Sequence, residues 1–131
     1  LAMSLARHGA ARTLLADLDL GAPRLARRLG LGAVPLSLAD WLSSDAPARS
    51  HFIRVGSSLA VCLNTEAVPD SAELLQDART ARRLQEATAA LDPTAVVYDL
   101  PPMLTTDDAL GFLPQVDCVL LVVAAGQTTS E

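Results

Sequence analysis

The sequence contains two short runs of the same form, Arg12-Thr-Leu-Leu-Ala-Asp17 and Thr94-Ala-Val-Val-Tyr-Asp99. Each is an apolar run of strand length that ends in an aspartate. Strands that are apolar on both faces are typical of parallel sheets covered by helices on each side. In such sheets, ligands bind beyond the carboxyl ends of the strands, where we expect Asp17 and Asp99 to lie.

Helical and strand-like patterns alternate along the rest of the sequence. Helical spacing of apolar residues predicts helices over 1–8, 23–29 and 36–42, and a helix pair or one bent helix over 72–91. Further strands are predicted over 51–55, 59–63 and the nearly continuous apolar run 116–124. The alternation predicts an α/β fold with three layers, in which a doubly wound, mainly parallel sheet carries helices on both faces.

Composition limits the possible chemistry. The 131 residues carry a net charge of −5, and all ten basic residues are arginine. Without lysine, the chain can supply neither a Schiff-base lysine nor a phosphate-binding loop of the form G-x-x-x-x-G-K-[ST]. The acidic balance argues against a nucleic-acid partner, because binding phosphates needs clustered positive charge.

The length and the apolar runs predict one soluble domain over residues 1–131. The longest apolar stretch is about half of the ~20 residues that a membrane helix needs, and no signal peptide is visible. Cys62 and Cys118 each lie inside an apolar run, so we expect both to be buried in a cytoplasmic protein. The first helix begins without a capping residue, and we expect the domain to continue beyond both ends of the chain.

Three carboxylates are candidates for chemistry. Asp17 and Asp99 end their strands, and Asp19 follows two residues after Asp17. Carboxylates that converge repel one another unless a cation lies between them, and Mg²⁺ favours one or two carboxylates together with water and phosphate oxygens. The alternative is that these aspartates only accept hydrogen bonds from the turns that follow their strands.

Four segments, in this order, resemble one protein family. They are the D-x-D segment 13–31, the P-x-x-x-E-L-L helix 69–75, the D-x-P-P segment 96–109 and the V-D-x-x-L-L-V-V-x-x-G-x-T-T segment 116–129. Together they resemble the deviant-Walker P-loop ATPases, and within them the bacterial tyrosine kinases of capsule and exopolysaccharide synthesis.

The resemblance implies a set of roles. Asp17 would be the catalytic base that accepts a tyrosine proton, Asp19 and Asp99 would hold Mg²⁺, and Ala125 and Gly126 would bind the adenine of ATP. It also implies a homo-oligomer that is activated by a membrane-anchored activator or chain-length regulator. The domain would then work in the cytoplasm, at the inner face of the cell membrane.

Several features depart from the family pattern. The family's phosphate-binding lysine lies in a loop that would precede Leu1. With that loop, the domain would be an ATP-hydrolysing protein-tyrosine kinase. Without it, we expect ATP to bind poorly. Gly21 and Leu100 replace the usual Arg and Thr, and the only tyrosine, Tyr98, is expected in the core. Two alternatives therefore stay open: a partitioning or division-site ATPase, and an inactive interaction module of a polysaccharide assembly complex.

Two arginine clusters are expected on solvated helix faces. One comprises Arg24, Arg27 and Arg28, for which contact with a partner subunit or an acidic tail is the alternative; the other comprises Arg79, Arg82 and Arg83.

Overall fold

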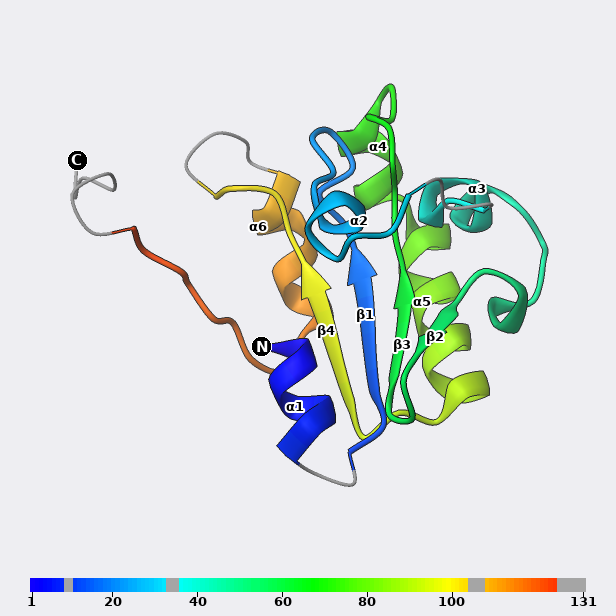
Figure 1. Cartoon of the computed structure of the whole chain (residues 1–131). Helices are drawn as coiled ribbons and strands as arrows, with labels where there is room; N and C mark the ends of the chain where they lie inside the picture. Colours follow the sequence, from blue (N-terminus) through cyan, green and yellow to red (C-terminus); the bar gives the residue numbers. More distant parts are fainter. Residues whose placement is uncertain (9–10, 33–35, 104–107, 125–131) are drawn as a thin grey trace.

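A four-stranded sheet forms the centre of the molecule (Figure 1). The computed structural model describes residues 1–8, 11–32, 36–103 and 108–124. The strands are β1 (Thr13–Asp17), β2 (Ile53–Val55), β3 (Leu59–Cys62) and β4 (Ala95–Asp99). Their order is β2-β3-β1-β4; β1 runs parallel to both β3 and β4, and β2 pairs antiparallel with β3.

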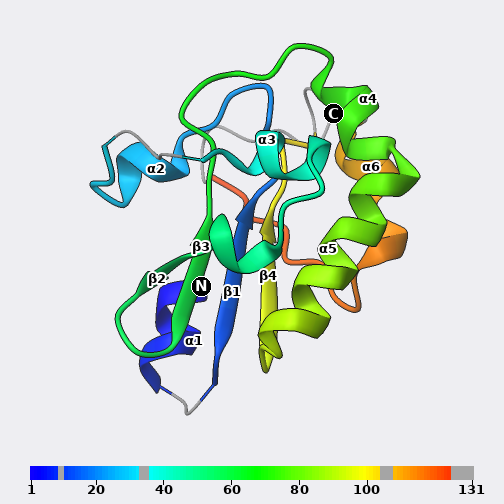
Figure 2. The ribbon, with the colours of Figure 1, turned by 90° about the vertical axis from the view of Figure 1, so that its right-hand side faces the viewer.

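Helices cover both faces of this sheet (Figure 2). On one face lie α1 (Ala2–His8) and α2 (Leu25–Arg28). On the other face lie α3 (Leu38–Ser43), α4 (Ser71–Gln76), α5 (Ala78–Leu91) and α6 (Asp108–Phe112). Short 3₁₀ turns η1 (Ala48–Ser50) and η2 (Leu113–Gln115) complete the elements. The three-layer α/β fold predicted from the sequence is confirmed.

The central strand β1 is buried along its whole length because both of its faces are covered. Leu14 packs into the cluster on the α3–α6 side, and Leu15 packs into the cluster with α1 and α2. This two-sided burial explains why the strand reads as a continuous apolar run. Tyr98 of β4 is half-buried and meets the ring of Phe112 edge-on at 5.2 Å, which confirms its predicted place in the core.

The predicted strand over 116–124 is wrong. Described residues 116–124 form no strand; Val116 is half-buried against the core, and the side chains of 117–124 are exposed, with Leu120 at 67% and Val122 at 84%. Cys118 is exposed as well, contrary to its predicted burial, whereas Cys62 is buried as expected. An apolar run gives a segment a tendency to be buried, but a strand also needs the hydrogen-bonding edge of a neighbour, and Figure 1 shows this segment running apart from β4.

Arg83 also differs from its prediction, because it is buried rather than solvated. Its guanidinium lies 4.5 Å from the centre of the Trp41 ring and donates hydrogen bonds to the carbonyls of Trp41 and Ala46. It also pairs with Glu86 at 2.9 Å. Its neighbour Arg82 remains exposed, as predicted.

Within the described part of the chain, none of the helices combines the length and apolar character that crossing a membrane requires.

Candidate functional site

The site is built on the pairing of β1 with β4. In their parallel register Asp17 lies opposite Asp99, and the Leu18 amide donates to the Asp99 carbonyl at 2.8 Å. Residues in register on neighbouring strands point to the same face of the sheet, and neighbouring strands are about 4.8 Å apart. The structure therefore brings the two predicted aspartates side by side at the carboxyl edge.

Asp17 is the most unusual group of the site. Its side chain is fully buried, and neither carboxylate oxygen accepts a hydrogen bond from the described residues. Burial, followed by the charge of Asp99, raises the pKa of Asp17 to about 7, although the backbone amides of Asn64 and Asp19 lie near enough to lower it in part. A carboxyl group with this pKa exchanges protons at neutral pH, as a general base must.

Asp19 and Arg28 also affect the pKa values of the aspartates in the site. Asp19 is half-buried, and its charge helps to raise the pKa values of both Asp17 and Asp99. The pKa of Asp99 is raised first by partial desolvation, and the nearby Arg28 guanidinium opposes that shift. The three predicted aspartates thus lie within electrostatic reach of one another, at the end of the sheet where a ligand is expected.

Asn64 was not predicted as a site residue. It follows β3, is almost fully buried, and donates through Nδ2 to the Asp17 carbonyl at 2.8 Å while its Oδ1 accepts from the Ala39 amide at 3.1 Å. It thereby fixes the backbone at Asp17 against the start of α3. In the sequence, the only indication of this role for Asn64 was its position as a polar residue directly after the apolar run 59–63.

The carboxylates suit a hard divalent cation. The buried oxygens of Asp17 have no partner among the described residues, and two acidic side chains in register repel each other unless positive charge is near. Among those same residues, no group of three or more His, Cys, Asp or Glu side chains is arranged to hold a metal. An Mg²⁺ ion that takes one or two carboxylates plus water and phosphate oxygens would not need such a group. Ala125 and Gly126, predicted to contact adenine, lie outside the described residues.

The fold and the placement of these aspartates can be compared with known proteins. No protein-family model and no curated protein sequence matches the chain. Among solved structures, the VpsO kinase domain superposes with a TM-score of 0.84 and 27% identity, covering 98% of this chain and 62% of that one. The chain therefore has the fold of the P-loop NTPases.

Two other solved structures with this fold extend the comparison. A ParA family ATPase from Chlorobium tepidum superposes with a TM-score of 0.67 at 16% identity, covering 88% of this chain and 49% of that one. Cobyrinic acid a,c-diamide synthase from Mycobacterium smegmatis, solved with an ATP analogue and magnesium, gives a TM-score of 0.52 at 28% identity, covering 70% and 39%. The structural neighbours of this chain are bacterial tyrosine kinase domains and related P-loop ATPases, which confirms the resemblance found in the sequence.

Proposed function

We propose that this chain is the major part of an ATP-dependent protein-tyrosine kinase domain that regulates exopolysaccharide or capsule synthesis and export. The observation that carries the proposal is the register-matched pair Asp17 and Asp99, at the carboxyl edge of a sheet whose fold matches the VpsO kinase domain. Because the chain spans 62% of that domain, the proposal concerns the larger protein to which these residues would belong.

Asp17 would act as the base in this proposal. Phosphoryl transfer depends mainly on positioning and charge neutralisation, and a carboxylate within reach of the tyrosine hydroxyl can accept its proton. The pKa of about 7 is that of Asp17 in the metal-free site, and the positive charge of Mg²⁺ on Asp19 and Asp99 would lower it, which favours the ionised form that a base needs. Asp19 and Asp99 would hold Mg²⁺, directly or through water, and bound MgATP would supply the phosphoryl group and the neutralising charge.

The phosphate-binding lysine has to come from elsewhere, since this sequence contains no lysine. We propose that a segment ahead of Leu1 carries the loop of the form G-K-[ST]. The helix α1 packs against β1 and β3, so a loop that leads into its first residues would belong to the same domain. The 131 residues alone should therefore bind ATP weakly.

The test is a phosphorylation assay on the complete polypeptide that contains these residues. With MgATP labelled at the γ-phosphate, we expect label on tyrosine, and its loss in Asp17→Asn and in Asp99→Asn. Asp117→Asn, an exposed aspartate away from the strand ends, serves as the matched control and should keep full activity. ATP hydrolysis without any phosphotyrosine would overturn the kinase proposal.

That assay also separates the two alternatives. The ParA-type fold match and the Leu20-Gly21 sequence after the D-x-D segment favour a partitioning or division-site ATPase, which would hydrolyse ATP in response to DNA or lipid. An inactive interaction module would bind no ATP by calorimetry even in the complete polypeptide.

For the kinase, we further propose a homo-oligomer held at the inner face of the cell membrane by a membrane-anchored activator or chain-length regulator.

A further inference from the structure

Arg28 is the last residue of α2, the short helix that follows the loop after β1 (Figure 1). Leu25 and Ala26 of this helix belong to the packed cluster that contains Leu15 of β1 and Val97 of β4. Those two strand residues each come two positions before an aspartate of the site. Because side chains alternate between the two faces of a strand, both aspartates point to the face of the sheet on which α2 packs.

The positive charge of Arg28 acts on this aspartate site. The guanidinium lowers the pKa of Asp99 against the effect of desolvation. Arg28 is nevertheless exposed, and it forms no direct ion pair with a carboxylate of the described residues. The arginine is therefore near enough to Asp99 to stabilise its charge, while its own donors are left for a ligand.

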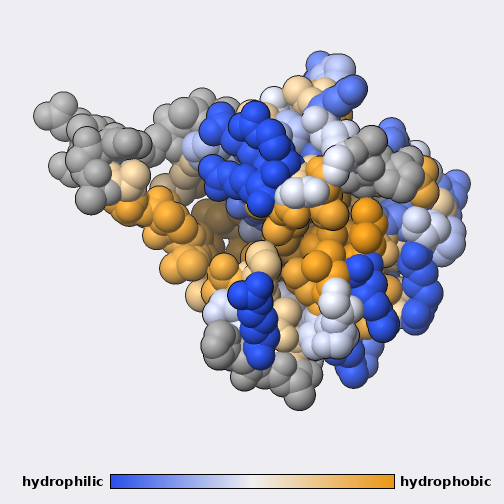
Figure 3. All heavy atoms as spheres, viewed as in Figure 1, coloured by the Kyte–Doolittle hydropathy of each residue, from blue (hydrophilic) through white to orange (hydrophobic). Residues whose placement is uncertain are grey.

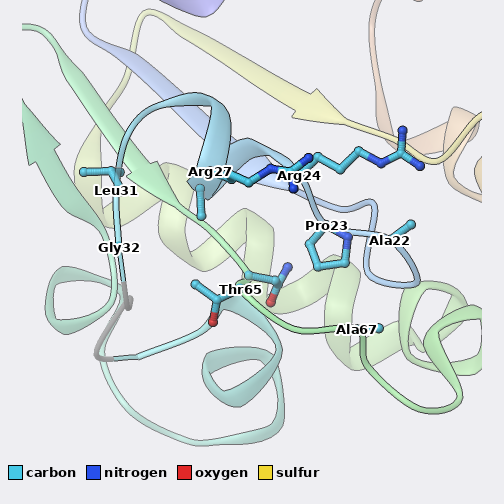
Figure 4. A pocket seen from close by; sticks show the side chains of 10 residues that line it. Ala22, Pro23, Arg24, Arg27, Leu31, Gly32, Thr65 and Ala67 are labelled. Atoms are coloured by element: carbon cyan, nitrogen blue, oxygen red, sulfur yellow. The ribbon is translucent and has the colours of Figure 1, made fainter.

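The two arginines beside Arg28 in the sequence border a different space. Arg24 and Arg27 line an open cavity of about 530 Å³ on the β3 side of α2, together with Thr65 from the segment after β3 (Figure 4). Arg28 is not among the residues that line this cavity. Successive residues of an α-helix are turned by about 100°, so Arg27 and Arg28 leave α2 in different directions. Arg27 thus offers a matched control, an exposed arginine of the same helix.

A guanidinium next to these carboxylates suits the chemistry of phosphoryl transfer. Negative charge on the oxygens of the transferred phosphoryl group has to be neutralised, and a guanidinium has a planar fork of donors that matches two phosphate oxygens. Because the chain contains no lysine, its permanently charged cationic side chains are all arginines. In the proposed kinase the phosphoryl group would pass between Asp17, the base, and the carboxylates Asp19 and Asp99 that would hold Mg²⁺. Arg28 borders that space through its proximity to Asp99.

We propose that Arg28 donates hydrogen bonds from its guanidinium to the terminal phosphate of bound MgATP and neutralises the charge on that phosphate during transfer. The inference rests on the proposed function in requiring that the complete polypeptide binds MgATP. Arg28 is exposed, as the sequence predicts for this arginine cluster, but the structure places its charge beside Asp99.

The test is calorimetric titration of the complete polypeptide with the non-hydrolysable ATP analogue AMP-PNP and with ADP, each with Mg²⁺. The two nucleotides differ in the terminal phosphate. Arg28→Gln should lose at least about tenfold in affinity for the analogue and less than about twofold for ADP, because a charge-assisted hydrogen bond to one phosphate is removed. Arg28→Lys keeps the charge and should lose less. Arg27→Gln should leave both affinities unchanged.

Titration with Mg²⁺ alone separates a contact with phosphate from a structural role of α2. Arg28→Gln should bind Mg²⁺ at least as tightly as the wild type, because a positive charge beside Asp99 is removed. Weaker binding of Mg²⁺, or an equal loss for both nucleotides, would overturn the proposal in favour of a structural role.

The outcome for Arg28 can be told apart from the outcome for the kinase. Unchanged affinity of Arg28→Gln for the ATP analogue would overturn the role of Arg28 and leave the kinase proposal standing. A wild type that binds the analogue but forms no phosphotyrosine would overturn the kinase proposal, while a selective loss in Arg28→Gln would still support the phosphate contact. A wild type that binds neither nucleotide would overturn both.

Discussion

At the scale of single residues, Asp17 is an acidic side chain held where water does not reach. Its two oxygens lack hydrogen-bond partners among the described residues, and Asp99 lies beside it in register. A buried carboxylate without partners destabilises the folded chain when it is charged. The protein tolerates this cost at a position where its fold places a ligand site, as is common for groups that act in catalysis.

The stability of the chain should therefore fall as the pH rises through the Asp17 titration. The folded pKa of about 7 exceeds the ordinary value of 3.8, so between these values the folded state binds more protons than the unfolded state. The free energy of unfolding should drop by up to about 4 kcal/mol from pH 4 to pH 8. Urea unfolding in EDTA should show this slope in the wild type and a much smaller slope in Asp17→Asn. An Asp117→Asn variant with the wild-type slope is the control, and an unchanged slope in Asp17→Asn would contradict the assignment.

Asn64 has a structural role that can be tested separately. Asn64→Ala should lower the free energy of unfolding by about 2–4 kcal/mol, because the Ala39 amide and the Asp17 carbonyl would lose buried hydrogen bonds. Urea unfolding at pH 7 measures this loss. The adjacent exposed Thr65→Ala should change stability by less than about 0.5 kcal/mol. A loss below about 1 kcal/mol for Asn64→Ala would show that water replaces its hydrogen bonds.

At the scale of elements, α5 is held to α3 by an arginine rather than by apolar contacts alone. Arg83 reaches from α5 across the face of Trp41 and donates to the carbonyls of Trp41 and Ala46 near the end of α3. Trp41 in turn meets Phe52 edge-on at 5.4 Å and donates through Nε1 to the Ala46 carbonyl at 3.1 Å. A charged side chain thereby fixes the loop after α3, which the periodicity of α5 did not indicate.

Two neighbouring arginines of α5 provide a matched comparison. Arg83→Met should lower the free energy of unfolding by about 2–4 kcal/mol, because it removes two charge-assisted hydrogen bonds to the carbonyls of Trp41 and Ala46 and the stacking on Trp41. Arg82→Met removes only an exposed 3.9 Å pair with Glu86 and should cost less than about 0.5 kcal/mol. Thermal or urea unfolding of both variants measures the difference. Equal effects would mean that the Arg83 contacts add no net stability.

At the scale of the whole molecule, the described residues leave an edge strand, β4, and an exposed apolar segment, 119–123. β4 is the last strand in the sheet order, and residues 119–123 expose between 54% and 84% of their surface. Figure 3 shows apolar side chains gathered along this segment and over the neighbouring face. An exposed apolar segment of this kind, together with an edge strand that lacks a second neighbour among the described residues, favours association with another chain.

The isolated chain should accordingly self-associate. Sedimentation velocity over a range of concentrations should show oligomers of the wild type and a shift toward monomer in Leu121→Glu/Val123→Glu, because two charges oppose burial of the segment. Leu36→Glu changes an exposed leucine elsewhere and should leave the association unchanged. A wild-type chain that stays monomeric at all concentrations would contradict this prediction.

Local sequence patterns predicted most helices and strands, because these elements reflect the spacing of apolar residues that are close together in the sequence. The strands at Thr13–Asp17 and Ala95–Asp99 and the helix pair Ser71–Gln76 and Ala78–Leu91 follow from apolar spacing alone. The segment 116–124 has the same apolar character as β1, but its structure depends on which edge lies beside it, and spacing carries no information about that. Asn64 was not predicted as a site residue, and Arg83 was predicted on a solvated helix face, for the same reason. The partners of their hydrogen bonds are 25 to 47 residues away in the chain.

The order of residues is sufficient to establish the α/β class, the strand ends that carry Asp17 and Asp99, and the lack of a lysine for phosphate binding. Folding places those two aspartates in register, buries the side chain of Asp17, and positions Arg24 and Arg27 beside a cavity. The physical reason is that the free energy of a charge depends on its burial and on its neighbours. The burial of a charge and its neighbours depend on strands and loops that are distant in the chain and meet only when the sheet forms.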